Sequence, residues 1–600
     1  MILANLVNYY EEHCADIDHN GRSVLPPMYY KDDYICAVIV LNKEGNIIRV
    51  ENHLDSKGRG EKRRVPANPK RTSGIAAFPF VDKSDYVIGC SLNKEKKSTI
   101  IKYTDRFNAF KKLNTELLEQ CNSPSALSFK RFLNSWNPEH SDYSIFDDIF
   151  LQGKLIAFKL EGNTYLLHEE PEVMKIWEEF SKKKQNEAKC DTCFVTGMQN
   201  VPLQAIQPAI KGLVGGTAEM SIISFNDNAY ESYGKVNSEN FQISCDASFK
   251  YVSALNYLLN NEKHFYRYAD STLVYWASAP KNSSGSHFQE EKYSDLLSML
   301  LAPPSDDQEN AKLGNIIRAF GSGRNYIEKE SELDPNTRFY LLSISPQSSR
   351  ICIRFYLEST FGELAKNFEY HFEDFSLEGV NKCPSFFEIL IQTVRHVSNQ
   401  KPDVNKIIKP NLSSSLFKSV LSGTAYPTTL YYQILERIRS DKYLSSLRFA
   451  IIKAYLNRLY RQHRYKEKIS MSLDKNIKNE AYLLGRLFAL IQSVQYHYNK
   501  DVNRDVADKF LSSASVKPAF IFPKLLSLCN KYLSKIKADK PGLAINLNKQ
   551  IMEILDNMQS QFPGRLDSYG QGTFLLGYYH QRQLNTNQKS TDSLRFENND

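Results

Sequence analysis

The sequence contains two clusters of cationic side chains whose type and spacing suit the binding of phosphate groups. The first is the stretch KGRGEKRRVPANPKR at 57–71, which holds seven cations and one anion, Glu61, in a chain whose formal net charge is only +8. Its cations are Lys57, Arg59, Lys62, Arg63, Arg64, Lys70 and Arg71. Because lysine and arginine neutralise phosphates, the stretch indicates contact with a polyanion, and a solvated basic loop is the alternative.

The second cluster lies between 431 and 470, where ten Lys or Arg residues stand against three Asp or Glu residues. Three of its arginines recur every three residues beside tyrosines: Arg458, Arg461 and Arg464, with Tyr455, Tyr460 and Tyr465. This spacing keeps the guanidinium groups on roughly one face of a helix, which is often only its solvated side. Two clusters, one of them with aromatic rings that can stack on bases, favour a nucleic acid instead.

Residues that could support catalysis are few. Cys190 and Cys193 form a CxxC pair, which is half of a familiar zinc site, but no second pair follows at a suitable spacing and structural cysteines are favoured. The GxG at Gly570 and Gly572 lacks the strand–turn–helix context of a dinucleotide site. We therefore predict no catalytic residue, no metal and no cofactor. A metal-dependent nuclease or other nucleic-acid-processing enzyme is the alternative.

The composition is typical of a globular protein, with 42% hydrophobic and 24% charged residues. Ten cysteines are spread through the chain without a dense pattern, which favours a reducing cytoplasm. The longest strongly apolar run, YICAVIVL at 34–41, is far shorter than the ~20 residues that cross a bilayer. We therefore expect a cytoplasmic protein without a membrane span.

The elements around the basic stretch are predicted from hydrophobic pattern and turn residues. Residues 34–41 and 47–50 indicate a β-hairpin, and the basic stretch follows it directly. The glycines and prolines of the stretch oppose helix and strand, so we expect a long exposed loop there. Two helices are expected further along, at 104–120 and 170–187.

The composition changes near residue 190, and from about 428 the pattern is nearly all helical. In between we expect a helix at 246–263, a buried strand at 271–278, a polar linker at 281–295 and a hairpin of 338–345 with 350–359. The predicted fold class is α+β, with mixed N-terminal and central regions followed by an all-α C-terminal bundle. The predicted domains are 1–188, 189–427 and 428–583, followed by a disordered tail at 584–600.

Four separated segments, in order, carry a resemblance to a known family. They are CDTCFVTGMQNVPLQAIQPAIKGLVGGTAEMSIISFNDNAYESYG, RFYLLSISPQSSRICIRFY, AYLLGRLFALIQSVQ and FLLGYYHQRQ. Together they resemble the large subunit of the type I-C CRISPR Cascade complex, and the similarity extends from the N-terminal hairpin to the last helix.

The resemblance implies a non-catalytic subunit of an RNA-guided DNA surveillance complex. Such a subunit recognises the protospacer-adjacent motif and stabilises the R-loop before a separate helicase-nuclease is recruited. The implied partners are CRISPR RNA, target double-stranded DNA with its displaced strand, the backbone and guide-processing subunits, and a small subunit. A third reading, a scaffold whose basic faces meet acidic proteins, stays open.

With the resemblance, each cluster gains an expected role. The stretch 57–71 is the candidate for the duplex beside the target, where its cations would contact phosphates and Asn68, Thr72 and Ser73 would reach base edges. Gly58 and Gly60 would permit close backbone approach. The candidates for guiding a nucleic-acid strand are Arg448, Lys453, Arg458, Arg461 and Arg464.

Met471 has an expected role of a different kind. In type I-C systems the small subunit resembles a separately translated copy of the large subunit's C-terminal part. Met471 precedes the final helical segment, and no other methionine lies between Met299 and Met552. We therefore expect it to be an internal translation start, and a methionine that begins a linker by chance is the alternative.

Overall fold

The structure is a computed structural model, and its described part has several gaps. It describes residues 2–597 apart from 18–20, 57, 68–70, 72–73, 93–99, 147–152, 218, 226, 279–285, 303–313, 317–318, 320–325, 329–330, 381, 396–408, 442, 500–504 and 559–560. Among the described residues, no helix is both long and apolar enough to cross a bilayer.

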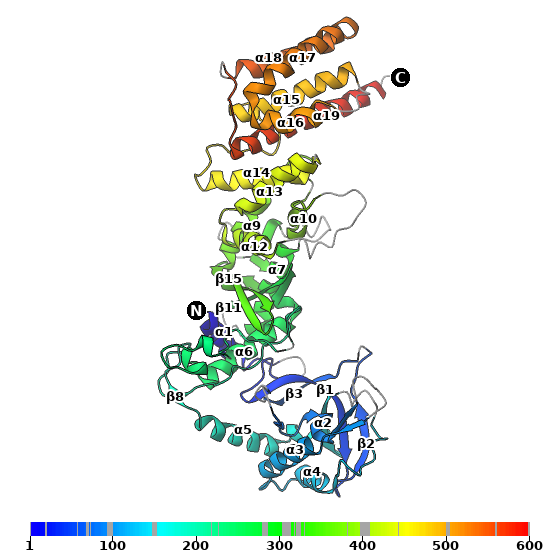
Figure 1. Cartoon of the computed structure of the whole chain (residues 1–600), viewed down its shortest axis with the longest axis vertical. Coiled ribbons are helices and arrows are strands. Elements are labelled where there is room, and N and C mark those ends of the chain that lie inside the picture. The colour runs from blue at the N-terminus through cyan, green and yellow to red at the C-terminus, as the bar shows by residue number, and fades with distance from the viewer. Residues whose placement is uncertain are drawn as a thin grey trace. The chain divides into compact units, whose positions relative to one another are not determined.

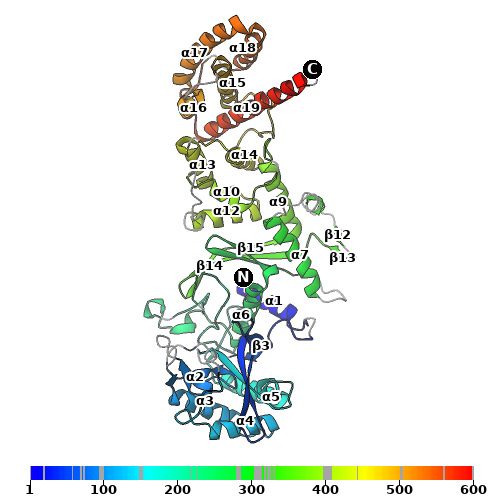
Figure 2. The same cartoon turned by 90° about the vertical axis from the view of Figure 1, so that its right-hand side faces the viewer.

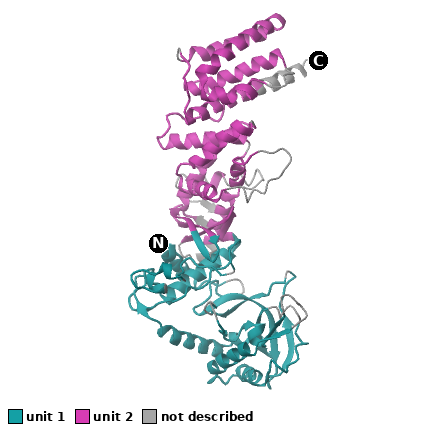
Figure 3. Ribbon diagram, in the orientation of Figure 1, with its two compact units in different colours: residues 1–262, 281–288, 346–352 teal, residues 263–280, 289–345, 353–600 magenta. Residues whose placement is uncertain are grey.

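The chain forms two compact units, shown in Figure 3. Unit 1 comprises 1–262, 281–288 and 346–352, and unit 2 comprises 263–280, 289–345 and 353–600. The predicted α+β class is confirmed, with sheets in the N-terminal and central regions and helices in the C-terminal region. The domain boundaries predicted from the sequence stay predictions.

Unit 1 is built around the long strand β1 (Tyr30–Leu41), which has partners along its whole length. Its second half pairs antiparallel with β2 (Ile47–Asn52) and parallel with β7 (Leu155–Leu160), while its first half pairs antiparallel with β3 (Glu61–Pro66). The short β4 (Asp82–Lys83) joins the far edge of β7. The predicted hairpin is therefore confirmed as β1 and β2. The second half of β1 is buried on both sides, and its β-branched residues favour such a strand.

Helices cover this sheet through aromatic packing. They are α2 (Ser84–Val87), α3 (Thr104–Leu117), α4 (Pro124–Ser135) and α5 (Pro171–Asn186). Phe110 of α3, Phe129 of α4 and Phe158 of β7 meet in the core, with the last two ring centroids 4.5 Å apart. The helices predicted at 104–120 and 170–187 are thus confirmed.

The rest of unit 1 contains the N-terminal helix, which packs on a helix from later in the sequence. Helix α1 (Ile2–His13) packs on α6 (Cys245–Asn260), where Tyr10 meets Phe249 edge to face. Two short paired ladders complete the unit: β5 (Cys90–Leu92) with β6 (Ile100–Lys102), and β8 (Cys190–Asp191) with β9 (Val201–Pro202). Helix α6 confirms the helix predicted at 246–263.

Unit 2 begins with a sheet in the order β10–β11–β14–β15. These strands are β10 (Phe265–Tyr268), β11 (Ser271–Ser278), β14 (Arg338–Gln347) and β15 (Arg350–Thr360). The predicted buried strand and the predicted hairpin are both confirmed. A second pair, β12 (Tyr326–Glu328) with β13 (Ser331–Leu333), lies between β11 and β14 in sequence.

The polar linker predicted at 281–295 is wrong from residue 286 onward, because that segment belongs to helix α7 (Ser286–Leu301). Residues 281–285 lie outside the described part. Polar residues dominate the first turns, but Tyr293, Leu297 and Leu300 follow at helical spacing and are buried. The apolar side of the helix thus becomes apparent only near the end of the predicted linker, at Tyr293, and continues beyond it.

The rest of unit 2 is helical, as predicted from residue 428 onward (Figures 1 and 2). Its helices are α9 (Phe361–Phe375), α10 (Phe386–Ile391), α12 (Pro410–Ser422), α13 (Thr428–Asp441), α14 (Ser446–Arg461), α15 (Glu480–Tyr498), α16 (Val506–Val516), α17 (Pro518–Asp539), α18 (Pro541–Asp556) and α19 (Ser568–Glu597). Of the predicted tail at 584–600, the side chains from 586 onward lie outside the described residues, while the α19 backbone continues to Glu597.

Helices α15 and α19 form the closest helix pair of the C-terminal bundle. A Cβ atom on Gly485 would overlap the carbonyl oxygen of Phe574, and one on Gly577 would overlap that of Tyr482. Gly572, part of the GxG noted in the sequence, lies in the first turns of α19 against the Tyr431 hydroxyl. These glycines therefore serve helix packing.

Candidate nucleic-acid interface

The basic stretch contains a strand where a loop was predicted. Residues Glu61–Pro66 form β3, which pairs with Tyr30–Ile35 so that Arg64 lies opposite Asp32 and Arg63 opposite Asp33. A Cβ on Gly60 would overlap the carbonyl oxygen of Ile35, so this glycine permits close approach to β1. The exposed-loop prediction is wrong for these residues. Lys57, Asn68, Lys70, Thr72 and Ser73 lie outside the described residues.

Arg63 and Arg64 are held by carboxylates of the same unit. The Arg63 Nε lies 2.8 Å from Glu61 Oε1, and its Nη1 lies 3.5 Å from Glu169 Oε1. Arg64 donates from Nε to Asp32 Oδ1 at 3.1 Å and from Nη1 to Ser23 Oγ at 2.6 Å. Both guanidinium groups fasten β3 to its surroundings, which leaves part of their charge neutralised.

Arg71 forms an ion pair with the buried carboxylate of Asp82. Its Nη2 donates to Asp82 Oδ2 at 2.5 Å, and its guanidinium lies 3.7 Å from the ring centroid of Phe78 and 3.9 Å from that of Tyr86. Asp82 is fully buried, and burial raises the pKa of its carboxyl to about 6 although the Arg71 charge acts to lower it. Arg71 therefore stabilises this part of the fold, and its guanidinium is occupied by Asp82 in this conformation.

Arg59 and Lys62 differ from these three arginines because both side chains are exposed. Arg59 follows a turn at Gly58, which has a φ of +71°, and its backbone N–H donates to Asp55 Oδ1 at 2.8 Å. Within the described part of the chain, no ion pair involves the Arg59 guanidinium. The Lys62 Nζ lies 3.3 Å from Asp32 Oδ2 at the surface, a weak attachment in water. These two cations are the described members of the stretch that are free to meet phosphate.

Several cationic side chains of the second cluster, at 431–470, are enclosed by the helices. Arg458 on α14 donates from Nε to Asp374 Oδ2 at 2.9 Å and from Nη2 to the Tyr426 hydroxyl at 2.9 Å. Arg461, one turn later, also reaches Asp374, with 2.9 Å between its Nη2 and Oδ1. The regular spacing predicted from the sequence thus brings two arginines to one carboxylate of α9.

Two further members of the cluster are also buried. Arg448 donates from Nη2 to Asp441 Oδ2 at 2.9 Å, and the Lys453 Nζ donates to the carbonyl oxygens of Glu373 and Asp374. Burial lowers the pKa of the Lys453 ammonium to about 8. The structure therefore corrects the expected strand-guiding role of Arg448, Lys453 and Arg458, because these side chains are enclosed by the bundle in this conformation.

Arg464 retains the exposure that was expected. Helix α14 ends at Arg461, so Arg464 lies in the following turn and does not continue the helical face. It lines a shallow surface pocket together with Tyr460, Arg461, His463, Tyr465 and Lys466. The cationic and aromatic character predicted for this region therefore persists at one end of α14.

A set of cations that the prediction omitted lies on α17. Lys524, Lys531 and Lys535 are exposed, and Lys517 precedes the helix. Their seven- and four-residue spacing is visible in the sequence, but which face of the helix is exposed is known only from the packed bundle.

The two cysteines of the CxxC pair lie in different surroundings. Cys190 is exposed and Cys193 is buried, where its sulfur accepts a hydrogen bond from Ser244 N–H at 3.3 Å. Burial raises the pKa of the Cys193 thiol, but hydrogen bonds from Ser244 and Thr196 outweigh it and lower this pKa to about 7. Among the described residues, no cluster of three or more His, Cys, Asp or Glu side chains is arranged to hold a metal.

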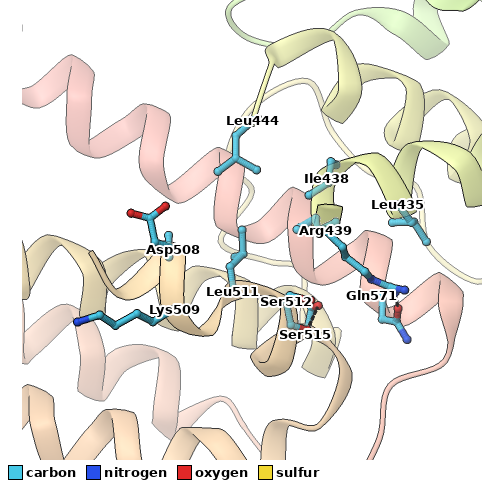
Figure 4. Close-up of a pocket in the computed structure, with 12 residues that line it drawn as sticks. Leu435, Ile438, Arg439, Leu444, Asp508, Lys509, Leu511, Ser512, Ser515 and Gln571 are labelled. Carbon is cyan, nitrogen blue, oxygen red and sulfur yellow. Dashed lines mark hydrogen bonds between the residues drawn. The ribbon is translucent and has the colours of Figure 1, made fainter. Parts of the chain in front are cut away.

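One small pocket opens in the C-terminal bundle between α13, α16 and α19 (Figure 4). It measures about 60 Å³ and is lined by Leu435, Ile438, Leu444, Leu511 and other side chains. At its edge Arg439 donates to the Gln571 side chain. Sites for small ligands usually measure several hundred Å³, so we assign no ligand to this pocket.

The comparison with family models bears on all these features together. The model described as CRISPR-associated protein (Cas_Csd1) matches residues 6–585, nearly the whole chain. The chain belongs to the Cas_Csd1 family. A search of curated proteins gives no match. Membership confirms the CRISPR-associated part of the resemblance seen in the sequence.

Met471, the expected internal start, lies between α14 and α15 of this Cas_Csd1 chain. Its side chain is exposed, and its carbonyl oxygen accepts a hydrogen bond from Glu378 N–H at 3.1 Å. Helix α15 begins after Asn479, whose side chain caps it by accepting from Ala481 N–H and Tyr482 N–H. A product that starts at Met471 would therefore contain helices α15 to α19.

Proposed function

We propose that this Cas_Csd1 chain is the non-catalytic large subunit of a type I-C CRISPR surveillance complex in the cytoplasm. It recognises the protospacer-adjacent motif beside the target and stabilises the R-loop before a helicase-nuclease is recruited. The observation that carries the proposal is the family match over residues 6–585, because it covers both the basic strand β3 and the C-terminal bundle.

The duplex beside the target meets the surface around β3. Arg59 and Lys62 supply the first phosphate contacts, since both are exposed. Arg63, Arg64 and Arg71 hold this segment in place through Glu61, Asp32 and Asp82 and contribute a positive field. Asn68, Thr72 and Ser73 follow β3 in the sequence and read base edges, and Lys57 and Lys70 of the same stretch supply further cations.

The C-terminal bundle serves the nucleic-acid strands and the small subunit. Arg461 and Arg464 remain from the predicted strand-guiding set, at the end of α14 where Tyr460 and Tyr465 are close by. Translation from Met471 supplies a small subunit with the same helices, α15 to α19. The other partners are CRISPR RNA and the backbone and guide-processing subunits.

Assembly tests this function directly. The chain is co-expressed with the backbone and guide-processing subunits and a CRISPR RNA, and a tag on a backbone subunit is used for purification. We expect the chain to co-purify with guide RNA at a fixed stoichiometry, and the purified complex to lack cleavage activity until the helicase-nuclease is added. A chain that never joins the guide-containing particle, or that cuts DNA alone, contradicts the proposal.

A further inference from the structure

Helix α17 presents a row of exposed lysines along one face. Lys524, Lys531 and Lys535 lie within the helix and Lys517 is its N-terminal cap residue, and all four are exposed. Steps of seven, seven and four residues return to nearly the same direction on a helix of 3.6 residues per turn. At 1.5 Å per residue, the row extends over about 27 Å.

Among the described residues, no acidic side chain neutralises the charge of this row. Asp539, at the C-terminal end, is the single acidic residue in the sequence of α17. Within the described part of the chain, none of the four ammonium groups forms an ion pair. The neighbouring helix α18 differs, because Lys549 is followed by Glu553 at helical spacing. A solvated helix face usually mixes both signs in this way, so the α17 row is unlike an ordinary solvated face.

Aromatic rings lie beside the lysines at the surface. Phe520 is 67% exposed, and the Lys524 Nζ lies 4.6 Å from its ring centroid. Tyr498 of α15 stacks on Tyr532 of α17 with centroids 4.6 Å apart, and Lys535 donates from Nζ to the Tyr498 hydroxyl at 3.1 Å. Rings next to cations are what single-strand binding surfaces use, because the cations neutralise phosphates and the rings stack on bases.

We propose that the α17 row binds single-stranded nucleic acid, with Lys517, Lys524, Lys531 and Lys535 on phosphates and Phe520 and Tyr498 on bases. A single strand fits better than a duplex, since paired bases offer no free face to an aromatic ring. This proposal rests on the proposed function, in which a DNA strand is displaced from the target. It moves the main strand contact from the buried cations of α14 to α17.

The test uses the full chain and a fluorescent oligo-dT probe, with binding followed by anisotropy over a series of salt concentrations. The variant combines Lys524→Gln, Lys531→Gln and Lys535→Gln. The matched control combines Lys182→Gln, Lys183→Gln and Lys184→Gln on α5, which are also three exposed lysines. We expect the α17 variant to lose about tenfold in affinity, and its log–log salt slope to fall by about 2, since each single-strand phosphate contact contributes about 0.7.

Further variants test whether binding needs only the positive charge of the α17 lysines and whether it needs the aromatic ring of Phe520. Replacing the three α17 lysines by arginine should retain binding, because either cation neutralises a phosphate. Phe520→Ala should weaken oligo-dT binding while leaving binding to a matched duplex unchanged. Circular dichroism checks that each variant is folded.

Three results overturn the proposal. They are no binding of oligo-dT by the wild-type chain at low salt, equal losses in the α17 variant and the α5 control, and equal binding of single strand and duplex without an effect of Phe520→Ala. The last result indicates a general polyanion or protein surface. Motif-dependent binding of the assembled complex to duplex targets is measured separately, so the α17 proposal can fail while the proposed function stands.

Discussion

Arg458 Nε lies 2.9 Å from Asp374 Oδ2, and both side chains are only 1% exposed. Arg461 approaches the same carboxylate from the edge of the bundle. Two arginines predicted to meet a nucleic acid thus join α14 to α9. The contribution of Arg458 to function is indirect, because it is buried and keeps α14 attached to α9, whereas Arg461 is partly exposed and also lines the surface at the end of α14.

Asp374→Asn should destabilise unit 2 strongly. The substitution preserves shape but leaves the Arg458 guanidinium buried without its counter-charge, a loss of about 3–5 kcal/mol for pairs of this kind. Thermal unfolding followed by circular dichroism measures the effect. Glu373→Gln is the matched control, because the adjacent Glu373 is 49% exposed and its ion pairs lie at the surface, so we expect less than about 1 kcal/mol. Equal midpoints for the two variants would contradict this account of Arg458.

The cations of the basic stretch should separate into two classes. Combining Arg59→Gln with Lys62→Gln should lower the salt slope of duplex binding by the complex by about 2, at about 0.9 per phosphate contact, without a change in thermal stability. Arg71→Gln should instead lower stability by about 1–3 kcal/mol, because the buried Asp82 loses its guanidinium partner and keeps only the backbone donors Phe78 N–H and Lys83 N–H. Lys182→Gln with Lys183→Gln controls for net charge. Unchanged duplex binding in the Arg59 and Lys62 double variant would show that this surface does not meet DNA.

His371 should make stability depend on pH. Its side chain is buried with Nδ1 2.8 Å from the Tyr426 hydroxyl, and burial, with the Arg458 charge, lowers its pKa to about 3. The unfolded chain titrates near pH 6.5, so below that pH the unfolded state binds the extra proton and the free energy of unfolding falls until about pH 3.

Denaturant unfolding at several pH values measures this dependence. In His371→Leu the slope between pH 6.5 and 4.5 should be shallower by up to about 1.4 kcal/mol per pH unit. His463→Gln, at an exposed position, is the matched histidine replacement. A His371→Leu variant with the wild-type slope would mean that this histidine is not neutral in the fold.

Met471 should begin a second product. Expression of the intact gene should yield the full chain and a polypeptide of residues 471–600, and replacing the Met471 codon by a leucine codon should remove only the short product. Mass spectrometry of the intact proteins identifies both. Met552→Leu is the control. If the same short polypeptide persists after the Met471 change, the start site lies elsewhere.

Much of the fold follows from local patterns in the sequence. The hairpin of β1 with β2, the buried strand β11 and the helices after residue 428 each have a clear apolar period. Strand β3 was missed because its residues are charged and flanked by glycine and proline. What makes it a strand is pairing with Tyr30–Ile35, a partner distant in sequence.

The candidate site was harder to predict because charge does not reveal exposure. Arg458 has the same local context as a surface arginine, and its partner Asp374 lies 84 residues earlier. The α17 lysines show the opposite case, because their spacing is plain in the sequence but only the packed bundle shows that their face is exposed. Cations with similar local sequences therefore have different roles, because some are buried in ion pairs and others are exposed.

The central claim is that this chain lets a guide-RNA complex recognise a motif beside its target. The decisive measurement is the affinity of the assembled complex for duplexes that share one target sequence and differ only in the flanking bases. We expect one short motif to be bound at least tenfold more tightly than the others, and Asn68→Ala to change that preference more than the salt dependence. Equal affinity for all flanking sequences, or an unchanged motif preference in a complex that lacks this chain, would contradict the account.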